Sequence, residues 1–134
     1  MISAEYCRTM ARYNTWQNNS LITAADGLTN VDHWKDRGAF FQSIAATLNH
    51  IYWADALILQ RLKGNEKRAP QLLDADLNGI VAWYKKGGSI RIERSTALCA
   101  AELFNHQTHR RGQVHAMLTA AGAKPEPTNI SMML

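Results

Sequence analysis

The sequence predicts an all-α protein that folds as one antiparallel four-helix bundle over residues 1–134. Three observations support this fold class. Apolar residues recur at helical intervals over long stretches, glycine and proline interrupt the chain between them, and strand-like alternation is confined to residues 89–93. A chain of 134 residues with 46% hydrophobic residues is large enough to bury a core as a single domain.

The first two predicted helices are bounded by capping residues and glycines. The first covers about residues 3–26, with Ser3 as its N-cap and Gly27 as its stop. Residues 28–38 are predicted to form a loop. The second helix covers about residues 39–62, and its apolar residues lie near a period of 3.6: Phe40, Ile44, Leu48, Ile51, Ala54, Ile58 and Leu62.

The other two predicted helices are separated by a short irregular stretch. After a polar connector, a shorter helix covers about residues 74–85 and stops at Gly87. Residues 89–93, with the sequence SIRIE, alternate in a way that favours extended backbone. The last helix covers about residues 95–121 and ends at Gly122, beyond which two prolines prevent its return.

Composition narrows the class of protein further. No stretch has 18 consecutive apolar residues, so we expect no membrane span. The N-terminal sequence MISAEYCRTMARYN lacks the apolar core of a signal peptide, which favours a cytoplasmic protein. Cys7 and Cys99 lie far apart and in no paired motif, so we expect buried, reduced thiols.

The positive charge of the chain raises the question of nucleic-acid binding. The formal net charge is +4, and the basic residues are scattered along the sequence without interleaved aromatic residues. No helix-turn-helix or zinc-finger spacing is present. We therefore expect no specific nucleic-acid binding, and any DNA association should disappear with added salt.

Three of the five histidines fall within residues 104–115, FNHQTHRRGQVH. Each residue of a helix turns by about 100°, so His109 lies about 60° from His106, and position 110 lies about 40° from it. These positions can converge on one point, as two imidazoles that share a metal ion must. His115 lies on the opposite side of the helix and is excluded from such a site.

A metal site would need a ligand from another helix, and His50 is the candidate. It lies in the middle of the second predicted helix, within the apolar stretch TLNHIYWADALIL. A lone histidine in such a place is more often a core residue than a ligand. Bundle cores do, however, build metal sites from side chains on facing helices. Both interpretations of His50 remain open from its position alone.

Three stretches of the chain resemble the DinB/YfiT-like superfamily of small four-helix proteins. They are MARYNTWQNNSL, DRGAFFQSIAATLNHIYWADALILQRLKG and FNHQTHRRGQVHAMLTAAG. The resemblance covers nearly all of the chain. It implies a four-helix bundle that binds a divalent cation through three histidines, and it implies relatives that act as thiol-dependent transferases or isomerases using bacillithiol, mycothiol or glutathione. Many members of the superfamily have no established reaction.

The resemblance supports His50 and His106 as ligands, but the chain departs from the motif at the third. The histidine that should precede the triplet RGQ is Arg110, and His109 lies one residue earlier. Arginine has no lone pair to donate. Three alternatives follow: His109 fills the vacant place, water completes a two-histidine site, or the metal site is lost. The first makes His50, His106 and His109 the predicted ligands.

The resemblance also sets the expected function and partners. We expect a metal-dependent thiol S-transferase or isomerase, or a hydrolase-like metalloenzyme, with Zn²⁺ or Ni²⁺ and a low-molecular-weight thiol. Arg110 and Gln113 are candidates for binding an anionic group of a small-molecule substrate. The alternative is a non-catalytic, stress-related bundle with a degraded metal site. Relatives of this kind pair, and the first and last helices are rich in apolar residues, so we expect a homodimer with a hydrophobic interface.

Overall fold

The computed structural model describes residues 2–63, 77–85 and 87–133. Its elements are α1 (Ala4–Asp26), α2 (Asn30–Trp34), α3 (Ile44–Lys63), β1 (Ile80–Tyr84), β2 (Arg91–Ser95), α4 (Thr96–Ala120) and the 3₁₀ helix η1 (Ile130–Met132). The described part of the chain is mostly helical, as predicted. It has three long helices, one short helix and a two-stranded sheet.

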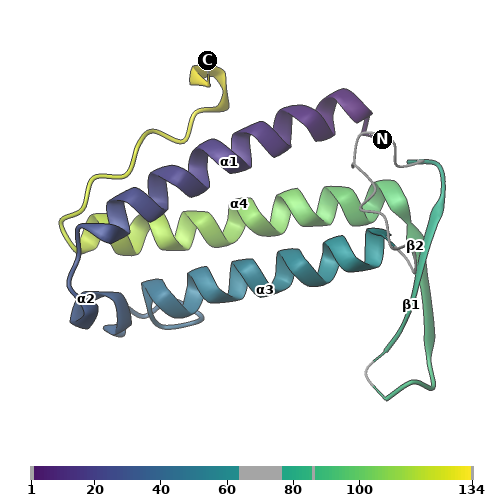
Figure 1. The fold of residues 1–134 in the computed structure, drawn as a ribbon, viewed down its shortest axis with the longest axis horizontal. Helices are drawn as coiled ribbons and strands as arrows, with labels where there is room; N and C mark the ends of the chain where they lie inside the picture. The colour runs from purple at the N-terminus through teal and green to yellow at the C-terminus, as the bar shows by residue number, and fades with distance from the viewer. Residues whose placement is uncertain (1, 64–76, 86, 134) are drawn as a thin grey trace.

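The three long helices lie side by side, and α4 contacts both α1 and α3 (Figure 1). Helices α3 and α4 run in opposite directions, which confirms the prediction that the second and last long helices are neighbours. The facing sides of α1, α3 and α4 enclose the main core, whose buried residues are Leu21, Ala25, Ile44, Ile51, Val114, Met117 and Leu118. Burial of this apolar surface holds the three helices together.

Capping side chains set the starts of two long helices, close to the predicted bounds. The Ser3 hydroxyl accepts a hydrogen bond from the Tyr6 backbone N–H at 3.0 Å, and Gly27 is the C-cap of α1. The Ser95 hydroxyl accepts from the Leu98 N–H at 3.5 Å and begins α4. Each hydroxyl satisfies one of the amides that a helix start leaves without a partner.

The helix predicted over residues 74–85 is wrong for its described part. Residues 74–76 lie outside the described residues, and Ile80–Tyr84 form β1, which pairs antiparallel with β2. The run IVAWY is rich in β-branched and aromatic residues, which favour a strand. A short apolar run like this fits both the helical period and the strand period. Pairing with β2, where extended backbone was expected, decides between them. In the described part, this hairpin stands where the third, shorter helix of the predicted bundle was expected.

The prediction also placed the start of the second long helix too early. Residues 28–38 contain the short helix α2 instead of only a loop, and α3 begins at Ile44 instead of residue 39. Between them Ala39 and Gln42 form a bridge that turns the chain, and the Ser43 hydroxyl accepts from the Ala46 N–H at 3.2 Å. Gln42 has a φ of 65°, in the left-handed region that disfavours a residue with a Cβ atom.

We expect Gln42→Gly to be more stable than Gln42→Ala by about 1 kcal/mol, because only glycine adopts this φ without strain. The Gln42 side chain is exposed, so both variants lose little packing. Urea unfolding of the two variants measures the difference. Equal free energies of unfolding would contradict strain at this turn.

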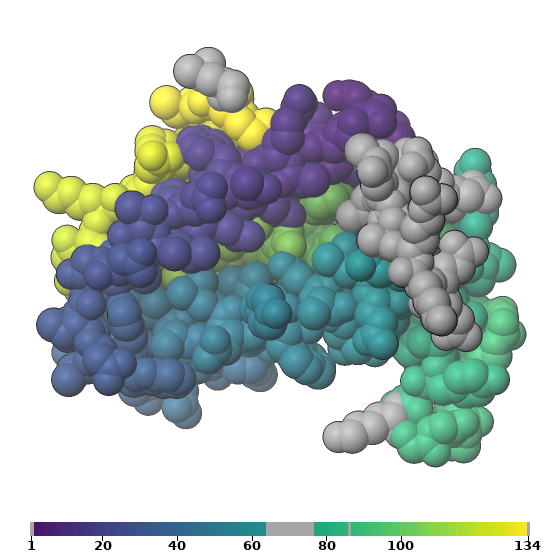
Figure 2. Space-filling model, in the orientation of Figure 1, coloured from purple at the N-terminus to yellow at the C-terminus, as the bar shows by residue number. Residues whose placement is uncertain are grey.

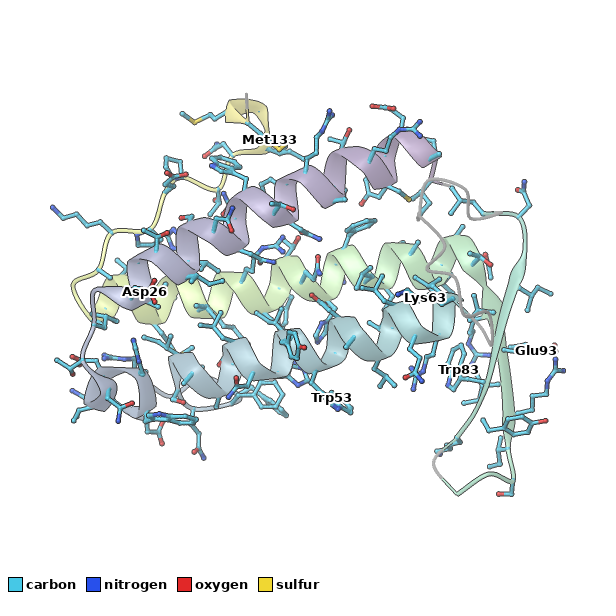
Figure 3. All side chains as sticks on the ribbon, in the orientation of Figure 1. Asp26, Trp53, Lys63, Trp83, Glu93 and Met133 are labelled. Atoms are coloured by element: carbon cyan, nitrogen blue, oxygen red, sulfur yellow. The ribbon has the colours of Figure 1, made fainter. Side chains whose placement is uncertain are left out.

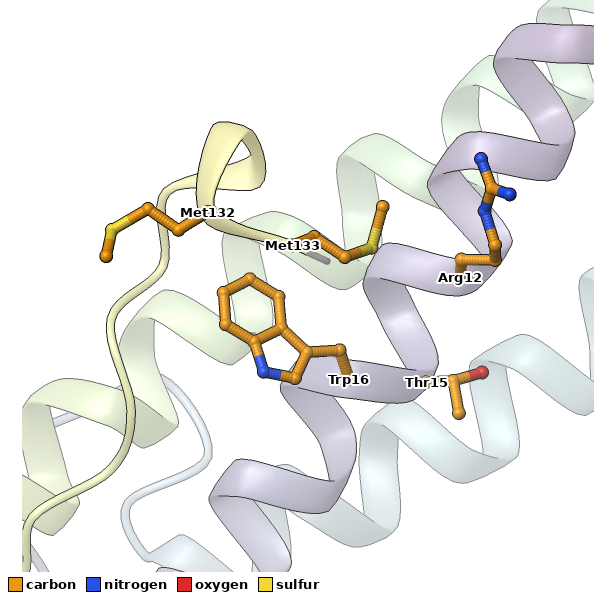
Figure 4. A pocket seen from close by; sticks show the side chains of 5 residues that line it. All are labelled: Arg12, Thr15, Trp16, Met132 and Met133. Carbon is orange, nitrogen blue, oxygen red and sulfur yellow. The ribbon is translucent and has the colours of Figure 1, made fainter.

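The segment that follows α4 runs back along α1 (Figure 1). The Tyr13 hydroxyl donates to the Thr128 carbonyl at 2.6 Å, the Trp16 indole N–H donates to the Glu126 carboxylate at 2.7 Å, and the Gln17 amide donates to the Pro127 carbonyl at 2.9 Å. A hollow of about 640 Å³ lies where the end of this segment meets α1 (Figure 4). The lining residues are Arg12, Thr15, Trp16, Met132 and Met133.

The described residues bear on the expectations for a membrane span and for the two cysteines. None of their helices is long and apolar enough to cross a membrane. Cys7 and Cys99 are both buried and form no disulfide, as expected. Burial raises the pKa of both thiols, so they are poor nucleophiles at neutral pH.

Candidate metal and ligand site

His50 and His106 face one another across the contact between α3 and α4. Their Nε2 atoms are 3.1 Å apart, and their ring centroids are 5.1 Å apart. His50 lies in the first half of α3 and His106 near the middle of α4, so the packing of the two helices sets their separation. The structure thus brings together two of the three predicted ligands.

Aromatic side chains surround the His50 ring. Phe41 stacks on it with ring centroids 3.9 Å apart, and Trp53 lies 6.4 Å away on the same helix. Phe40 packs edge-on against Phe41. Trp53 projects from α3 and is 62% exposed (Figure 3), and both His50 and His106 are only partly buried. The turn before α3, with the left-handed Gln42, places Phe41 against His50.

Arg110 lies beside the histidine pair, at the position where the resemblance to the DinB/YfiT-like superfamily implies a third histidine. Its guanidinium carbon is 4.9 Å from the centre of the Phe41 ring and 5.2 Å from that of Phe40. One guanidinium N–H donates to the Gln113 side-chain oxygen at 3.3 Å. Cation–π contacts of this kind hold the positive charge within reach of the site. The two predicted substrate-binding residues, Arg110 and Gln113, are therefore in contact with each other.

His109 and His115 do not join this pair in the described part of the chain, although the charge of His109 lies near enough to lower the pKa of His106. His109 is exposed, and neither it nor His115 makes a hydrogen bond or a ring contact with His50 or His106. Among the described residues, no three side chains of histidine, cysteine, aspartate or glutamate form a group that could hold a metal ion. Ligation by His109 remains a prediction that requires its side chain to turn toward His106.

Both imidazoles of the pair are neutral at neutral pH. Burial lowers the pKa of His50, and the nearby His106 and Arg110 lower it further. Burial and Arg110 likewise lower the pKa of His106, although Glu102 acts in the opposite direction. Neutral imidazole is the form that donates a lone pair to a metal.

The two imidazoles fit two positions of a tetrahedral metal site. Two nitrogen ligands with bonds of about 2.0–2.1 Å lie roughly 3.3 Å apart in such a site, close to the observed 3.1 Å. The buried His106 Nδ1 has no hydrogen-bond partner among the described residues. Most metal-binding histidines have such a partner, which orients the ring. The residues present therefore fit a cation with two protein ligands and leave the three-histidine set incomplete.

A second group of polar residues, which sequence reasoning did not connect, lies on the other side of the contact between α3 and α4. The Gln107 amide donates to the Asp55 carboxylate at 2.5 Å, and burial raises the pKa of Asp55. Arg111 is almost fully buried, and its guanidinium lies 5.4 Å from the centre of the Tyr13 ring. Helical spacing places Asp55 about 140° from His50 and Gln107 about 100° from His106, so both lie on other faces of their helices. The charge of Asp55 still acts on the pair, because it opposes the lowering of the His50 pKa by burial.

In the metal-free protein, we expect stability to fall as the pH drops below about 6.5, the ordinary pKa of histidine. The pKa of His106 is lowered in the folded state, so the unfolded chain binds more protons in this range and acid favours unfolding. His106→Gln should flatten this dependence, whereas His115→Gln should leave it in place. Urea unfolding between pH 5 and pH 8 with a chelator present tests this, and an unchanged slope in His106→Gln contradicts it.

These features define a helical protein in which two neighbouring long helices present a pair of neutral imidazoles beside an arginine. The sequence model of the DinB family matches residues 1–86 of the 134, and the chain belongs to the DinB family. The matched region contains His50 and Phe41, while the whole of α4 lies beyond it. The chain matches no curated protein and no solved structure.

Proposed function

We propose that this member of the DinB family binds a divalent cation, Zn²⁺ or Ni²⁺, through the Nε2 atoms of His50 and His106. The observation that carries the proposal is the 3.1 Å separation of these two atoms, close to that of two ligands on one metal ion. The lowered pKa of both rings supports it, because ligating imidazoles are neutral.

A site with two protein ligands leaves coordination positions for molecules from solution. The aromatic side chains of Phe41 and Trp53 flank His50, and the Arg110 guanidinium lies over the Phe41 ring. We propose a small-molecule substrate whose carboxylate or other anionic group binds Arg110, since guanidinium pairs with planar anions through two hydrogen bonds. Gln113 orients that guanidinium through its side-chain oxygen.

The proposed reaction class is a thiol-dependent transfer or isomerisation. A divalent cation held by His50 and His106 would lower the pKa of a low-molecular-weight thiol bound at an open coordination position. The residues of the chain keep the two imidazoles neutral, place an anionic group of the substrate near Arg110, and present aromatic surface to the rest of it. A thiol-conjugation assay with glutathione and an electrophilic acceptor tests this step.

A second candidate function is metal-independent binding of an anionic ligand. Two observations favour it: Arg110 occupies the place of the third histidine, and the His106 Nδ1 has no orienting partner among the described residues. In this case the ligand binds with equal affinity in the presence of a chelator. The two candidates therefore differ in their requirement for metal.

We expect His50→Ala to abolish binding of Zn²⁺, because one imidazole alone holds a divalent ion weakly. Calorimetric titration of the metal-free protein with Zn²⁺ and with Ni²⁺ measures this. His115→Ala is the matched control and should bind as the unaltered protein does. Unchanged binding by a folded His50→Ala variant would show that the cation binds elsewhere.

A further inference from the structure

The hairpin of β1 and β2 presents an open sheet edge. It extends beyond the end of the three long helices (Figures 1 and 2). The strands pair antiparallel, with Ala82 opposite Glu93 and Tyr84 opposite Arg91. In the described ranges each strand has only the other as its neighbour, so β2 has a free edge. A free edge carries backbone N–H and C=O groups that another strand can bind.

The hydrogen-bond pattern shows which residues of β2 present those groups. The Lys85 N–H donates to the Ile90 carbonyl at 2.8 Å, and the Thr96 N–H donates to the Gly79 carbonyl at 3.0 Å. Opposite pairs in an antiparallel sheet alternate between bonded and non-bonded. The backbone groups of Arg91, Glu93 and Ser95 therefore point away from β1, toward the free edge.

The side chains at this edge carry alternating charge. Arg91 and Glu93 lie on the same face of β2 and form an ion pair with each other. About half of each side chain remains exposed, at 56% and 49%. Glu93 points away from the helices, while Trp83 on β1 lies on the side that faces them (Figure 3). Both charges are therefore accessible to an approaching strand.

We infer that β2 binds β2 of a second copy of this chain, in antiparallel orientation about a two-fold axis at Ile92. Arg91 then lies opposite Glu93 of the partner subunit, and Glu93 lies opposite the partner's Arg91. Both are residues whose backbone groups face the free edge, so they form the bonded pairs of the new ladder. The two hairpins become one four-stranded antiparallel sheet, joined by an interface in which both copies use the same surface.

Charge selects this register over its neighbours. A two-fold axis at Arg91 sets two arginines opposite each other, and an axis at Glu93 sets two glutamates opposite each other. Like charges directly opposite one another destabilise a strand pair, whereas opposite charges stabilise it. The outward residues of β1, which are Ile80, Ala82 and Tyr84, carry no charge that would select one register.

This interface is independent of the metal site. It also differs from the homodimer that the sequence predicts, which uses apolar surfaces of the first and last helices instead of a polar strand edge. Strand addition at a five-residue edge buries little area, so the dimer should be weak and depend on concentration.

Sedimentation equilibrium of the full chain tests the inference. Protein concentrations from ~10 µM to ~1 mM allow a dimer dissociation constant in that range to be measured. The unaltered protein should pass from monomer to dimer. Arg91→Glu and Glu93→Arg should each raise the dissociation constant at least about tenfold, because each places two like-charged pairs opposite one another. Circular dichroism checks that both variants keep their helices.

Mixing the two variants provides a matched control that does not depend on the stability of either hairpin. An Arg91→Glu chain paired with a Glu93→Arg chain again has opposite charges at both contacts, so the equimolar mixture should form a heterodimer. The double variant, with both charges exchanged, should dimerise as the unaltered protein does. Any of three results overturns the inference: the unaltered protein stays monomeric up to ~1 mM, the single variants dimerise as the unaltered protein does, or the equimolar mixture stays monomeric.

Discussion

Replacing Arg110 with histidine is expected to tighten Zn²⁺ binding by about a hundredfold or more. Position 110 follows His106 by four residues, so the two side chains lie on the same face of α4. The Arg110 guanidinium already lies beside Phe41, the ring that stacks on His50. An imidazole at this place adds a third neutral donor and removes a positive charge that opposes the cation.

Two further variants separate these contributions. Arg110→Gln removes the charge without adding a nitrogen donor, so its gain should be much smaller than that of Arg110→His. His109→Gln should bind Zn²⁺ with the same affinity as the unaltered protein if the exposed His109 is not a ligand. Calorimetric titration of all three with Zn²⁺ gives the comparison. A loss of affinity in His109→Gln would instead establish that this side chain turns in and completes the site.

Replacing Phe104 with alanine is expected to lower the free energy of unfolding by about 3–5 kcal/mol. Phe104 is only 2% exposed and packs with Cys7 and Ala100 where α1 meets α4. Tyr6 meets its ring edge-on at a centroid distance of 5.9 Å. The loss combines the removed apolar contact with the cavity that the remaining side chains fill only in part.

Leu98→Ala is the matched control on the same helix. Leu98 is 47% exposed, so its removal should change stability by only about 0.5 kcal/mol. Urea unfolding of both variants, followed by circular dichroism, measures the difference. If the two substitutions cost the same, the contact between α1 and α4 around Phe104 is not the packed core described above.

Much of the candidate site follows from local sequence rules. His50 and His106 each lie on a long helix whose period is legible from apolar spacing, and the start of α4 is legible from Ser95, whereas the start of α3 was predicted too early. Helical geometry also excludes His115 from the pair, because it follows His106 by nine residues and so lies on the opposite face of the helix. The contact between Phe41 and His50 was not predictable, because a turn with a left-handed Gln42 brings the ring there.

The sequence by itself determined the three long helices of this DinB-family protein, the serines at the starts of α1 and α4, and the helix faces on which His50 and His106 lie. These features depend on spacing within one segment, and burial of the apolar stripes follows from it. Only the tertiary structure decided that residues 80–84 form a strand and that Arg110 packs over two phenylalanine rings. A short apolar run fits both the helical and the strand period, so pairing with a distant segment decides its structure. A long cationic side chain has many rotamers, so its contacts with distant residues decide its conformation.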